Sequence, residues 1–179
     1  NEELVAEGAR ITALETRAVG LTWNFAPVLD VARQPLWSRF FESYGEDVLL
    51  ATRLGSANIL AQQELGESGY PNVAATAKHF VGYSMPLSGK DRTPAWIPER
   101  MLREYFLPPF EKAVDDGILT LMVNSAEVNG EPVHASHWLL TEILKDEMGF
   151  EGIIVTDWED IKKLVDSHRV AGTFKEAVR

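Results

Sequence analysis

The feature that most limits the fold is an alternation of short apolar runs with longer segments of helical periodicity. The apolar runs lie at residues 21–29, 73–77, 119–123 and 153–156. Each is rich in β-branched residues or closed by a polar residue, which is typical of a strand buried on both faces. The helical segments lie at residues 3–19, 48–65, 98–114, 138–147 and from 159 onward. Strands that alternate with helices in this way predict parallel βαβ units and an α/β fold.

The connections between these elements differ in length at the two ends of the predicted strands. Short, glycine-containing turns join each helix to the next strand, at residues 66–72, 115–118 and 148–152. Long loops join each strand to the next helix, at residues 30–47, 80–97 and 124–136. In (β/α) folds the loops after the strands build the active site, whereas the loops on the other side serve stability. We therefore expect one functional face, at the carboxyl ends of the strands.

The charge balance excludes several classes of partner. The chain has 17 Lys and Arg against 27 Asp and Glu, which gives a formal net charge of −10. Nucleic acids and anionic lipids are bound through clustered Lys and Arg, so neither is an expected partner. No apolar run reaches the ~18 residues of a membrane-spanning helix, so we expect no membrane insertion. The chain contains no cysteine and no nucleotide-binding glycine motif, so we expect a neutral ligand and no cofactor.

Polar and ionisable residues close each predicted strand. They are Asp30 with Arg33 and Arg39 in its loop, the pair Lys78 and His79, the pair Asn124 and Ser125, and the pair Asp157 and Trp158. In a parallel barrel these side chains converge at one rim, which predicts a pocket with carboxylates, cations, an imidazole and an aromatic plate. The alternative is that strand ends are solvated and simply tolerate polar residues.

Asp157 has two interpretations from its position alone. It follows the apolar run at 153–156, which would hold its carboxylate rigidly at the floor of a pocket. A rigid, ionised carboxylate beside cations suits a nucleophile for a sugar carbon, because its neighbours keep its pKa low. Trp158 beside it offers a flat apolar face of the kind on which sugar rings stack. The alternative is that Asp157 is the N-cap of the helix that follows.

Several blocks of the sequence resemble the N-terminal barrel domain of glycoside hydrolase family 3, the β-glucosidase family. The blocks are NFAPVLDVAR at 24–33, SRFFESYGED at 38–47, VAATAKHFVGY at 73–83 and GFEGIIVTDWED at 149–160. The resemblance implies a parallel (β/α) TIM-barrel fold and a retaining, exo-acting β-glucosidase that forms a covalent glycosyl-enzyme on Asp157. It implies these substrate-binding residues: Asp30, Arg39, Lys78, His79, Met122 and Trp158. The implied partner is a β-linked glucoside or oligosaccharide.

The chain departs from the family pattern at two places. Where the family commonly has Ser-Tyr-Asn after the methionine of the third strand, this chain has Val123, Asn124 and Ser125 after Met122, so the tyrosine is missing. Residues 80–83 read FVGY, without the Pro-Gly-His-Gly run of the family's N-acetylhexosaminidase branch. The resemblance therefore favours glucoside hydrolysis. β-Xylosidase and β-N-acetylhexosaminidase activities are the alternatives within the family.

The length indicates part of a barrel. A closed eight-stranded barrel typically takes ~250 residues, whereas this chain has 179 residues and four predicted strands. We expect residues 1–179 to form a single segment with about half of the eight βα units, without the closing strands and the C-terminal domain. The resemblance assigns the acid/base to that further domain, and the local carboxylates Glu127, Glu131 and Glu159 match no family motif. The isolated chain would then be inactive.

Two further sequence patterns have both a functional and a structural interpretation, and two other functions are alternatives. We expect Asp91 and Arg92 to pin the long loop at 80–97 rather than reach the pocket. His134 and His137 are spaced like a metal pair but have no third ligand, so no metal is expected. The rival functions are a noncatalytic sugar-binding half-barrel and a metal-dependent barrel hydrolase. The compartment is open, and the family resemblance alone slightly favours a periplasmic or secreted location.

Overall fold

The centre of the molecule is a three-stranded parallel sheet in the order β1-β2-β5. The computed structural model describes residues 1–67, 69 and 71–179. Its strands are β1 (Thr76–Phe80), β2 (Thr120–Val123), β3 (Glu127–Val128), β4 (Glu131–Pro132) and β5 (Ile153–Val155). Its helices are α1 (Glu2–Ala18), η1 (Phe40–Glu42), α2 (Val48–Gln62), α3 (Glu99–Met101), η2 (Leu102–Phe106), α4 (Pro108–Asp115), η3 (Val133–Ala135), η4 (Trp138–Glu147), α5 (Asp160–Asp166) and α6 (Phe174–Ala177). The predicted parallel α/β fold is confirmed.

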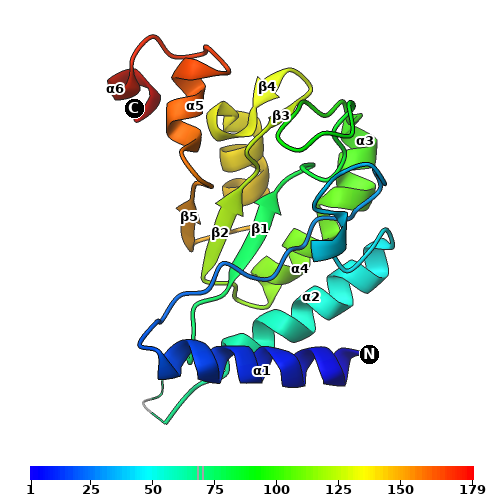
Figure 1. The fold of residues 1–179 in the computed structure, drawn as a ribbon, viewed down its shortest axis with the longest axis vertical. Helices are drawn as coiled ribbons and strands as arrows, with labels where there is room; N and C mark the ends of the chain where they lie inside the picture. The colour runs from blue at the N-terminus through cyan, green and yellow to red at the C-terminus, as the bar shows by residue number, and fades with distance from the viewer. Residues whose placement is uncertain (68, 70) are drawn as a thin grey trace.

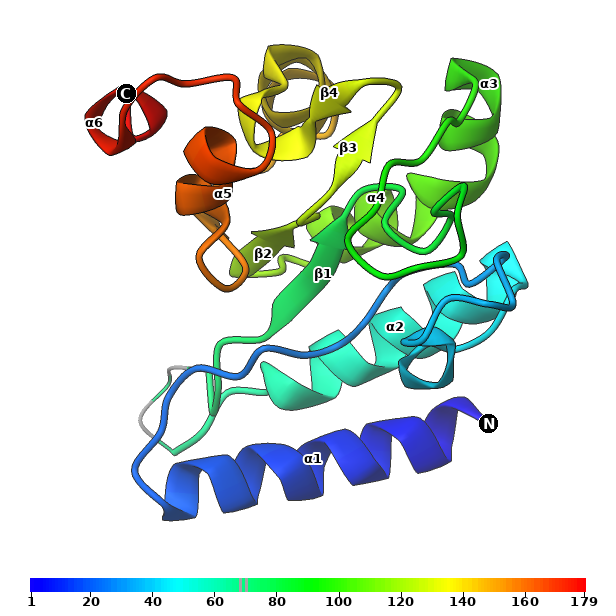
Figure 2. The same cartoon turned by 45° about the horizontal axis from the view of Figure 1, so that its top comes forward.

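Helices α4, α2 and α1 are stacked beside the sheet. α4 packs against β1 and α2, and α2 packs in turn against α1. Figures 1 and 2 show α1 and α2 side by side below the sheet, whereas α5 and α6 lie on the side of β5. The rings of Phe80 in β1 and Phe110 in α4 meet edge to face with centroids 5.3 Å apart, and both side chains are fully buried. Burial of such a side chain contributes roughly 1.5–3 kcal/mol.

The first predicted strand, at 21–29, is not a regular strand. It runs parallel to β1 and to the residues just before it. It forms only isolated β-bridges with them, from Trp23 to Ala74 and from Val28 to Lys78. Pro27 lies between these bridges and has no N–H to donate, so the ladder is interrupted there. The position and direction of this segment agree with the prediction, and its regularity does not.

The second predicted strand is displaced along the chain. β1 begins at Thr76 and ends at Phe80, three residues later than the predicted run at 73–77. Lys78 and His79 therefore lie inside the strand rather than after it. The pairing with β2 shifts register between Lys78 and Phe80, as in a β-bulge, and such irregularities redirect side chains near active sites. β2 and β5 lie where they were predicted, and β2 is buried along its length. The expected burial on both faces is wrong for β5, because it is an edge strand and Ile153 is exposed.

Two of the predicted helices have a different form. The segment at 98–114 divides into α3, η2 and α4, because Pro108 and Pro109 have no N–H for a continuous ladder. The segment at 138–147 is a π-helix, η4, whose wider turns the apolar periodicity alone does not distinguish from an α-helix. α1 and α2 agree closely with their predicted segments and are capped by the side chains of Asn1 and Asp47.

The two ends of the sheet differ as the loop lengths predict. Turns containing Gly117 and Gly149, both at positive φ, close α4 and η4 on the amino side of β2 and β5. The predicted turn at 66–72 lies partly outside the described residues. On the carboxyl side, the loop at 124–136 folds into the β3–β4 hairpin around Asn129 and Gly130.

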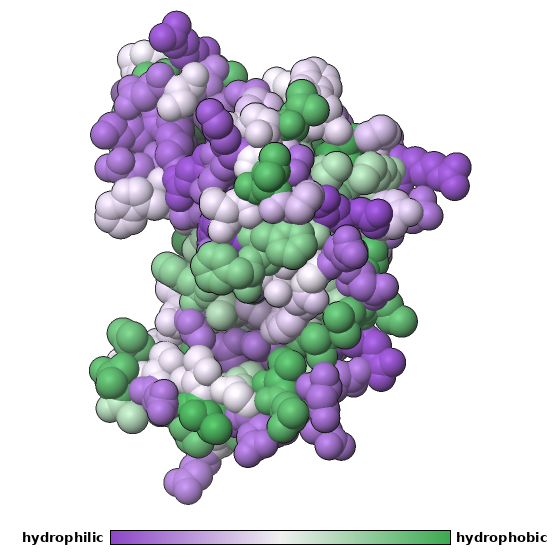
Figure 3. Space-filling view, turned by 45° about the vertical axis from the view of Figure 1, so that its right-hand side comes forward, coloured by the Kyte–Doolittle hydropathy of each residue, from purple (hydrophilic) through white to green (hydrophobic). Residues whose placement is uncertain are grey.

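The outer surface of α1 carries exposed apolar side chains. Leu4, Ile11 and Leu14 are each at least half exposed. In Figure 3 apolar residues gather at the bottom of the molecule, whereas the top is mainly hydrophilic. Within the described residues, no helix is both long and apolar enough to cross a membrane.

Candidate active site

Asp30 and His79 form a buried pair at the carboxyl end of β1. One carboxylate oxygen, Asp30 Oδ2, accepts a hydrogen bond from the backbone N–H of His79 at 3.1 Å and lies 2.8 Å from His79 Nδ1. Both side chains are about 1% exposed. Because an ionised carboxylate can only accept, Nδ1 carries the hydrogen in this pair. The other ring nitrogen, Nε2, faces Asp157 Oδ2 at 3.9 Å.

Asp157 lies directly beyond β5 and is surrounded by donors. Oδ1 accepts from the backbone N–H of Trp158 at 2.5 Å, and the guanidinium of Arg92 is 3.4 Å away. Oδ2 accepts from the hydroxyl of Ser125 at 3.0 Å. The N-cap interpretation of Asp157 is wrong, because α5 begins at Asp160 and Glu159 occupies the cap position.

The environment of Asp157 keeps its carboxylate ionised. Partial burial works to raise the pKa of Asp157, but the Trp158 N–H, the nearby His79 imidazole, the Arg92 guanidinium and the Ser125 hydroxyl together lower it below its ordinary value of 3.8. The side chain is 15% exposed, so it is not fully enclosed by the protein. A partly buried, ionised carboxylate has the chemical character of a nucleophile.

Asp91 and Arg92 have separate roles in the long loop at 80–97. Asp91 Oδ1 accepts from the indole N–H of Trp37 at 2.8 Å, which pins the loop as expected. Arg92 instead reaches both Asp157 and Asp160, so the expectation that it only pins the loop is wrong. Its backbone adopts a φ of 58°, a conformation that is uncommon for a non-glycine residue and is often found at functional sites.

A second carboxylate, Asp160, lies behind Asp157 and was not singled out from the sequence. Its side chain is 1% exposed. Oδ1 lies 2.6 Å from Lys163 Nζ, and Oδ2 accepts from the Ser125 hydroxyl at 2.7 Å. Nε2 of His134 approaches Oδ2 to 3.5 Å without hydrogen-bond geometry. The sequence signal that could have found it is the spacing of three residues between Asp157 and Asp160. This spacing is about one helical turn and can place two side chains on the same side of the chain.

Arg39 and Lys78 place two cations near these carboxylates. Arg39 makes a bidentate pair with Glu42, with both N–O distances 2.8 Å, and lies over the ring of Tyr83. Burial, followed by repulsion from Arg39, lowers the pKa of Lys78, although Asp157 and Asp30 are among the charges that oppose this shift. Glu42 was not singled out from the sequence either, and its pairing restrains Arg39.

Met122 and Trp158 occupy contrasting environments. Met122 lies in β2, in register with Lys78 of β1 and Val155 of β5, and its side chain is 5% exposed. Trp158 is 75% exposed beside Asp157. An exposed indole next to a carboxylate is available to contact an apolar sugar face. Met122 instead belongs to the packed floor beneath the site.

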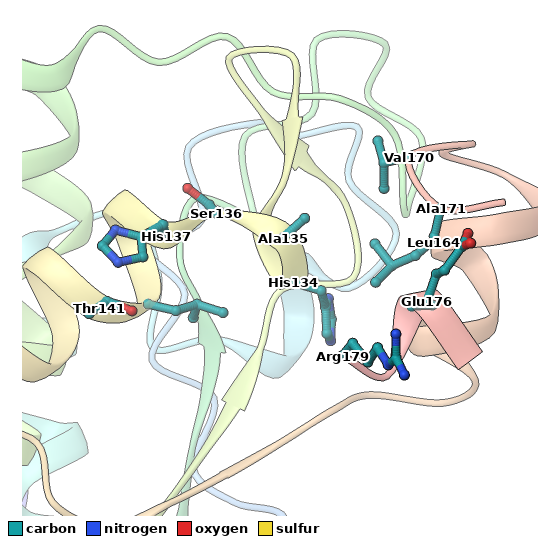
Figure 4. Close-up of a pocket in the computed structure, with 12 residues that line it drawn as sticks. His134, Ala135, Ser136, His137, Thr141, Leu164, Val170, Ala171, Glu176 and Arg179 are labelled. Carbon is teal, nitrogen blue, oxygen red and sulfur yellow. The ribbon is translucent and has the colours of Figure 1, made fainter. Parts of the chain in front are cut away.

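The other local carboxylates and histidines are engaged elsewhere. Glu127 pairs with His168 at 2.7 Å, Glu131 accepts from Ser136 at 2.6 Å, and Glu159 lies 3.9 Å from Lys162. His137 faces Glu142, away from His134, and both histidines line a pocket of about 480 Å³ between η4 and the α5–α6 region (Figure 4). Among the described residues, no group of three or more His, Asp or Glu has a metal-binding arrangement.

Comparison with known proteins assigns the family. Residues 1–179 match the model of the glycosyl hydrolase family 3 N terminal domain. The chain belongs to glycoside hydrolase family 3. The resemblance noted in the sequence is thereby confirmed.

Curated relatives in glycoside hydrolase family 3 are much longer than this chain. A lysosomal β-glucosidase of Dictyostelium discoideum is 51% identical over 184 residues, which cover 99% of this chain and 22% of that protein. A β-xylosidase of Formosa agariphila is 44% identical over 179 residues, which cover 98% of this chain and 25% of that protein. The chain therefore spans about a quarter of the length of these relatives.

Solved structures of this family share the fold. A β-glucosidase from Listeria innocua, solved in complex with glucose, matches 99% of this chain and 25% of its own with a TM-score of 0.93 and 32% identity. A β-glucosidase from Erythrobacter marinus matches 98% of this chain and 24% of its own, also with a TM-score of 0.93, at 34% identity. These matches confirm the predicted parallel (β/α)-barrel type of fold.

Proposed function

We propose that this chain is the segment of a retaining β-glucosidase that carries the catalytic nucleophile, Asp157. The observation that carries the proposal is the environment of this carboxylate. It lies just beyond the carboxyl end of the parallel strand β5, has a lowered pKa, and faces three side-chain partners, namely His79, Arg92 and Ser125. Membership of glycoside hydrolase family 3 and relatives named β-glucosidase support the same reaction.

In the first step the ionised Asp157 carboxylate attacks the anomeric carbon of the sugar. The glycosidic bond breaks, and its electron pair goes to the aglycone oxygen, which takes a proton from the acid/base. In the second step, water attacks the same carbon and gives a proton to that acid/base, and the carboxylate leaves. Both steps need Asp157 to be a stable anion when it is free, which its donors provide.

The sugar in this proposal is held by the predicted residues around Asp157. Asp30, His79 and Lys78 line the carboxyl end of β1, where a carboxylate accepts hydrogen bonds from sugar hydroxyls and cations donate to them. Arg39, restrained by Glu42, supplies further donors. Trp158 offers its exposed face, and Met122 forms part of the floor.

The acid/base in this proposal lies outside residues 1–179. A retaining glycosidase needs a second carboxyl group about 5–5.5 Å from the nucleophile. Glu127, Glu131 and Glu159 are paired elsewhere. We therefore assign the chain to one part of a longer barrel domain, completed by further strands and by a C-terminal domain that supplies this group.

Two substrate classes are supported by named relatives. The Listeria innocua enzyme has been solved in complex with glucose, and a mutant of it in complex with laminaribiose, which favours β-glucosides as substrates. The 44% identity to a β-xylosidase favours β-xylosides as the second candidate. The ratio of kcat/KM for aryl β-glucoside and aryl β-xyloside substrates, measured with the complete natural protein that contains this chain, decides between them.

The nucleophile is tested by covalent trapping. An activated 2-deoxy-2-fluoro-β-glucoside, incubated with the complete natural protein, should add one glycosyl mass to the peptide that contains Asp157. Asp157→Asn should abolish the label, and Glu151→Gln, which changes an exposed carboxylate just before β5, should retain it. A label on another carboxylate overturns the assignment. Sugar binding without turnover or label would favour a noncatalytic sugar-binding segment.

A further inference from the structure

The hydroxyl of Ser125 lies between two carboxylates. Ser125 Oγ is 3.0 Å from Asp157 Oδ2 and 2.7 Å from Asp160 Oδ2, and both distances are those of hydrogen bonds. A serine hydroxyl has one hydrogen, and an ionised carboxylate has none to donate. At any moment, therefore, Ser125 can donate fully to only one of these two groups.

The two acceptors differ in how they are held. Asp160 is buried and is paired with Lys163, with Arg92 3.8 Å away and His134 3.5 Å away. Asp157 is more exposed, and its charge is the one that the proposed reaction removes and restores. A hydrogen bond to a charged acceptor is roughly twice as strong as one to a neutral acceptor. Asp157 is therefore a strong acceptor for the Ser125 hydrogen when it is ionised, and a weaker one when it is bound to the sugar.

We propose that Ser125 is a switchable hydrogen-bond donor and that Asp160 is its alternative acceptor. Both act as positioning residues. This inference rests on the proposed function of Asp157 and adds to it. In the free enzyme Ser125 is shared between the two carboxylates. When Asp157 becomes a glycosyl ester, Ser125 donates to Asp160.

The departure of Asp157 from the sugar is the step that uses the switch. Water attacks the anomeric carbon, the ester C–O bond breaks, and its electron pair returns to the Asp157 carboxylate. The water proton goes to the acid/base carboxyl of the complete enzyme. Ser125 keeps its own proton throughout and only turns its O–H from Asp160 to Asp157. The new hydrogen bond stabilises the leaving carboxylate as its charge develops.

Two variants should shift the balance of the two steps in opposite directions. Ser125→Ala removes the donor, so the leaving carboxylate is less stabilised and deglycosylation should slow by about tenfold. Glycosylation should become somewhat faster, because the free carboxylate no longer has a hydrogen bond that weakens as it attacks. Asp160→Asn weakens the competing acceptor, so Ser125 should stay on Asp157. A Ser125 hydrogen that stays on Asp157 stabilises the free carboxylate relative to the glycosyl ester. The rate of glycosylation should therefore fall, and the rate of deglycosylation should stay the same.

The experiment separates these steps with a dinitrophenyl β-glucoside and the complete natural protein. With this activated substrate, kcat/KM reports glycosylation, and a pre-steady-state burst shows when kcat reports deglycosylation. The expected result is a lower ratio of kcat to kcat/KM in Ser125→Ala and a higher ratio in Asp160→Asn. Ser125→Thr, which keeps a hydroxyl, should restore the original ratio.

Ser136→Ala is the matched control, because Ser136 is also a buried serine that donates to a carboxylate, Glu131, and does not contact Asp157. Its ratio should not change. Shifts of the same sign in Ser125→Ala and Asp160→Asn, or no shift in either, overturn the inference while Asp157 still labels. If Ser125→Ala does not fold, an unchanged ratio in Asp160→Asn overturns it. Absence of both turnover and label in the unmutated protein overturns the proposed function as well.

Discussion

The two ends of the β1-β2-β5 sheet are held together by different chemistry. At the amino ends, the indole N–H of Trp23 lies 2.9 Å from each of the hydroxyls of Thr76 and Thr120, which are 2.7 Å from each other. The side-chain amide of Gln63 bonds to the backbone of Gly117 and Leu119. At the carboxyl ends ionisable side chains contact one another, as Asp30 contacts His79 and Asp157 contacts Arg92.

This difference shows what each end does for the protein. Neutral hydrogen bonds fix the strands at a modest desolvation cost and do not change with pH. Buried carboxylates and cations cost more to desolvate, and each needs a partner. In return, their pKa values respond to their neighbours, as at Asp157. The amino end is therefore suited to stability and the carboxyl end to chemistry.

The sharpest test of this division is removal of the charge on Asp157. Asp157→Asn should lower kcat by about 10³-fold or more, because no anion remains to attack the sugar. At neutral pH the thermal unfolding midpoint should fall slightly, because the amide keeps the volume but loses the stabilisation that an ionised carboxyl with a lowered pKa gives to the folded protein. Glu151→Gln, on the amino side of β5, should leave both quantities unchanged. An unchanged kcat in Asp157→Asn would contradict the division.

A substitution that creates a steric clash at the amino end should lower stability and leave kcat unchanged. In Gly152→Ala the new methyl group would lie 2.7 Å from the ring of Phe150 and would meet the carbonyl oxygen of Leu119. Overpacking of this kind should lower the free energy of unfolding by about 1–3 kcal/mol, as measured by urea denaturation. The kcat per folded molecule should not change. Gly8→Ala, which meets nothing within 4 Å, is the control and should not destabilise the protein.

Arg92→Gln tests how the carboxyl end controls pH dependence. Arg92 helps to keep the pKa of Asp157 low, so its loss should raise that pKa, and the acidic limb of kcat/KM should move to higher pH. A carboxyl whose pKa is lowered in the folded protein stabilises the fold fully above the unfolded pKa, and this stabilisation is lost as pH falls through the folded pKa. In Arg92→Gln the free energy of unfolding should therefore decrease most above the unfolded pKa of Asp157, and the loss should shrink as the pH falls toward the folded pKa. We expect kcat/KM to fall by about tenfold at neutral pH.

The control for this variant is Arg100→Gln in α3, where an exposed arginine pairs only with Glu104 among the described residues. Its pH profile should match that of the unmutated protein. An unchanged acidic limb in Arg92→Gln would show that the Trp158 N–H, His79 and the Ser125 hydroxyl keep the pKa of Asp157 low without Arg92.

The smallest expected effect is at the neutral end. Thr120→Val removes one of the two hydroxyls beside Trp23 and should lower the free energy of unfolding by about 1 kcal/mol, because Thr76 remains as a partner. The loss should be the same at pH 5 and pH 8. Thr12→Val in α1, whose hydroxyl bonds to a helix carbonyl at the surface, should change stability by less than about 0.5 kcal/mol. A pH-dependent loss in Thr120→Val would contradict the neutral character of this end.

Local sequence signals predicted much of the fold and some of the site. β2, β5, α1 and α2 were predicted because apolar periodicity and caps are local properties of the chain. The structure brings Asp30, His79 and Asp157 together, as expected of residues that close neighbouring parallel strands. Their roles in catalysis and sugar binding remain predictions.

Other features depended on contacts that are distant in sequence. The boundaries of β1 are set by its pairing with β2 and with the segment at 21–29, where Pro27 interrupts the ladder. Arg92 looked like a residue that pins its own loop, because nothing local indicates that its guanidinium reaches a carboxylate 65 positions later in the chain (157 − 92).

The sequence by itself determined that the strands are parallel, that their carboxyl ends carry the ionisable groups, and that Asp157 follows the last of them. Only the tertiary structure decided that Ser125 stands between Asp157 and Asp160, and that Arg92 faces both carboxylates. The physical reason is the range of the interactions. Hydrophobic periodicity acts between near neighbours in the chain, whereas a pKa and a shared hydrogen bond depend on which groups folding brings within a few ångströms.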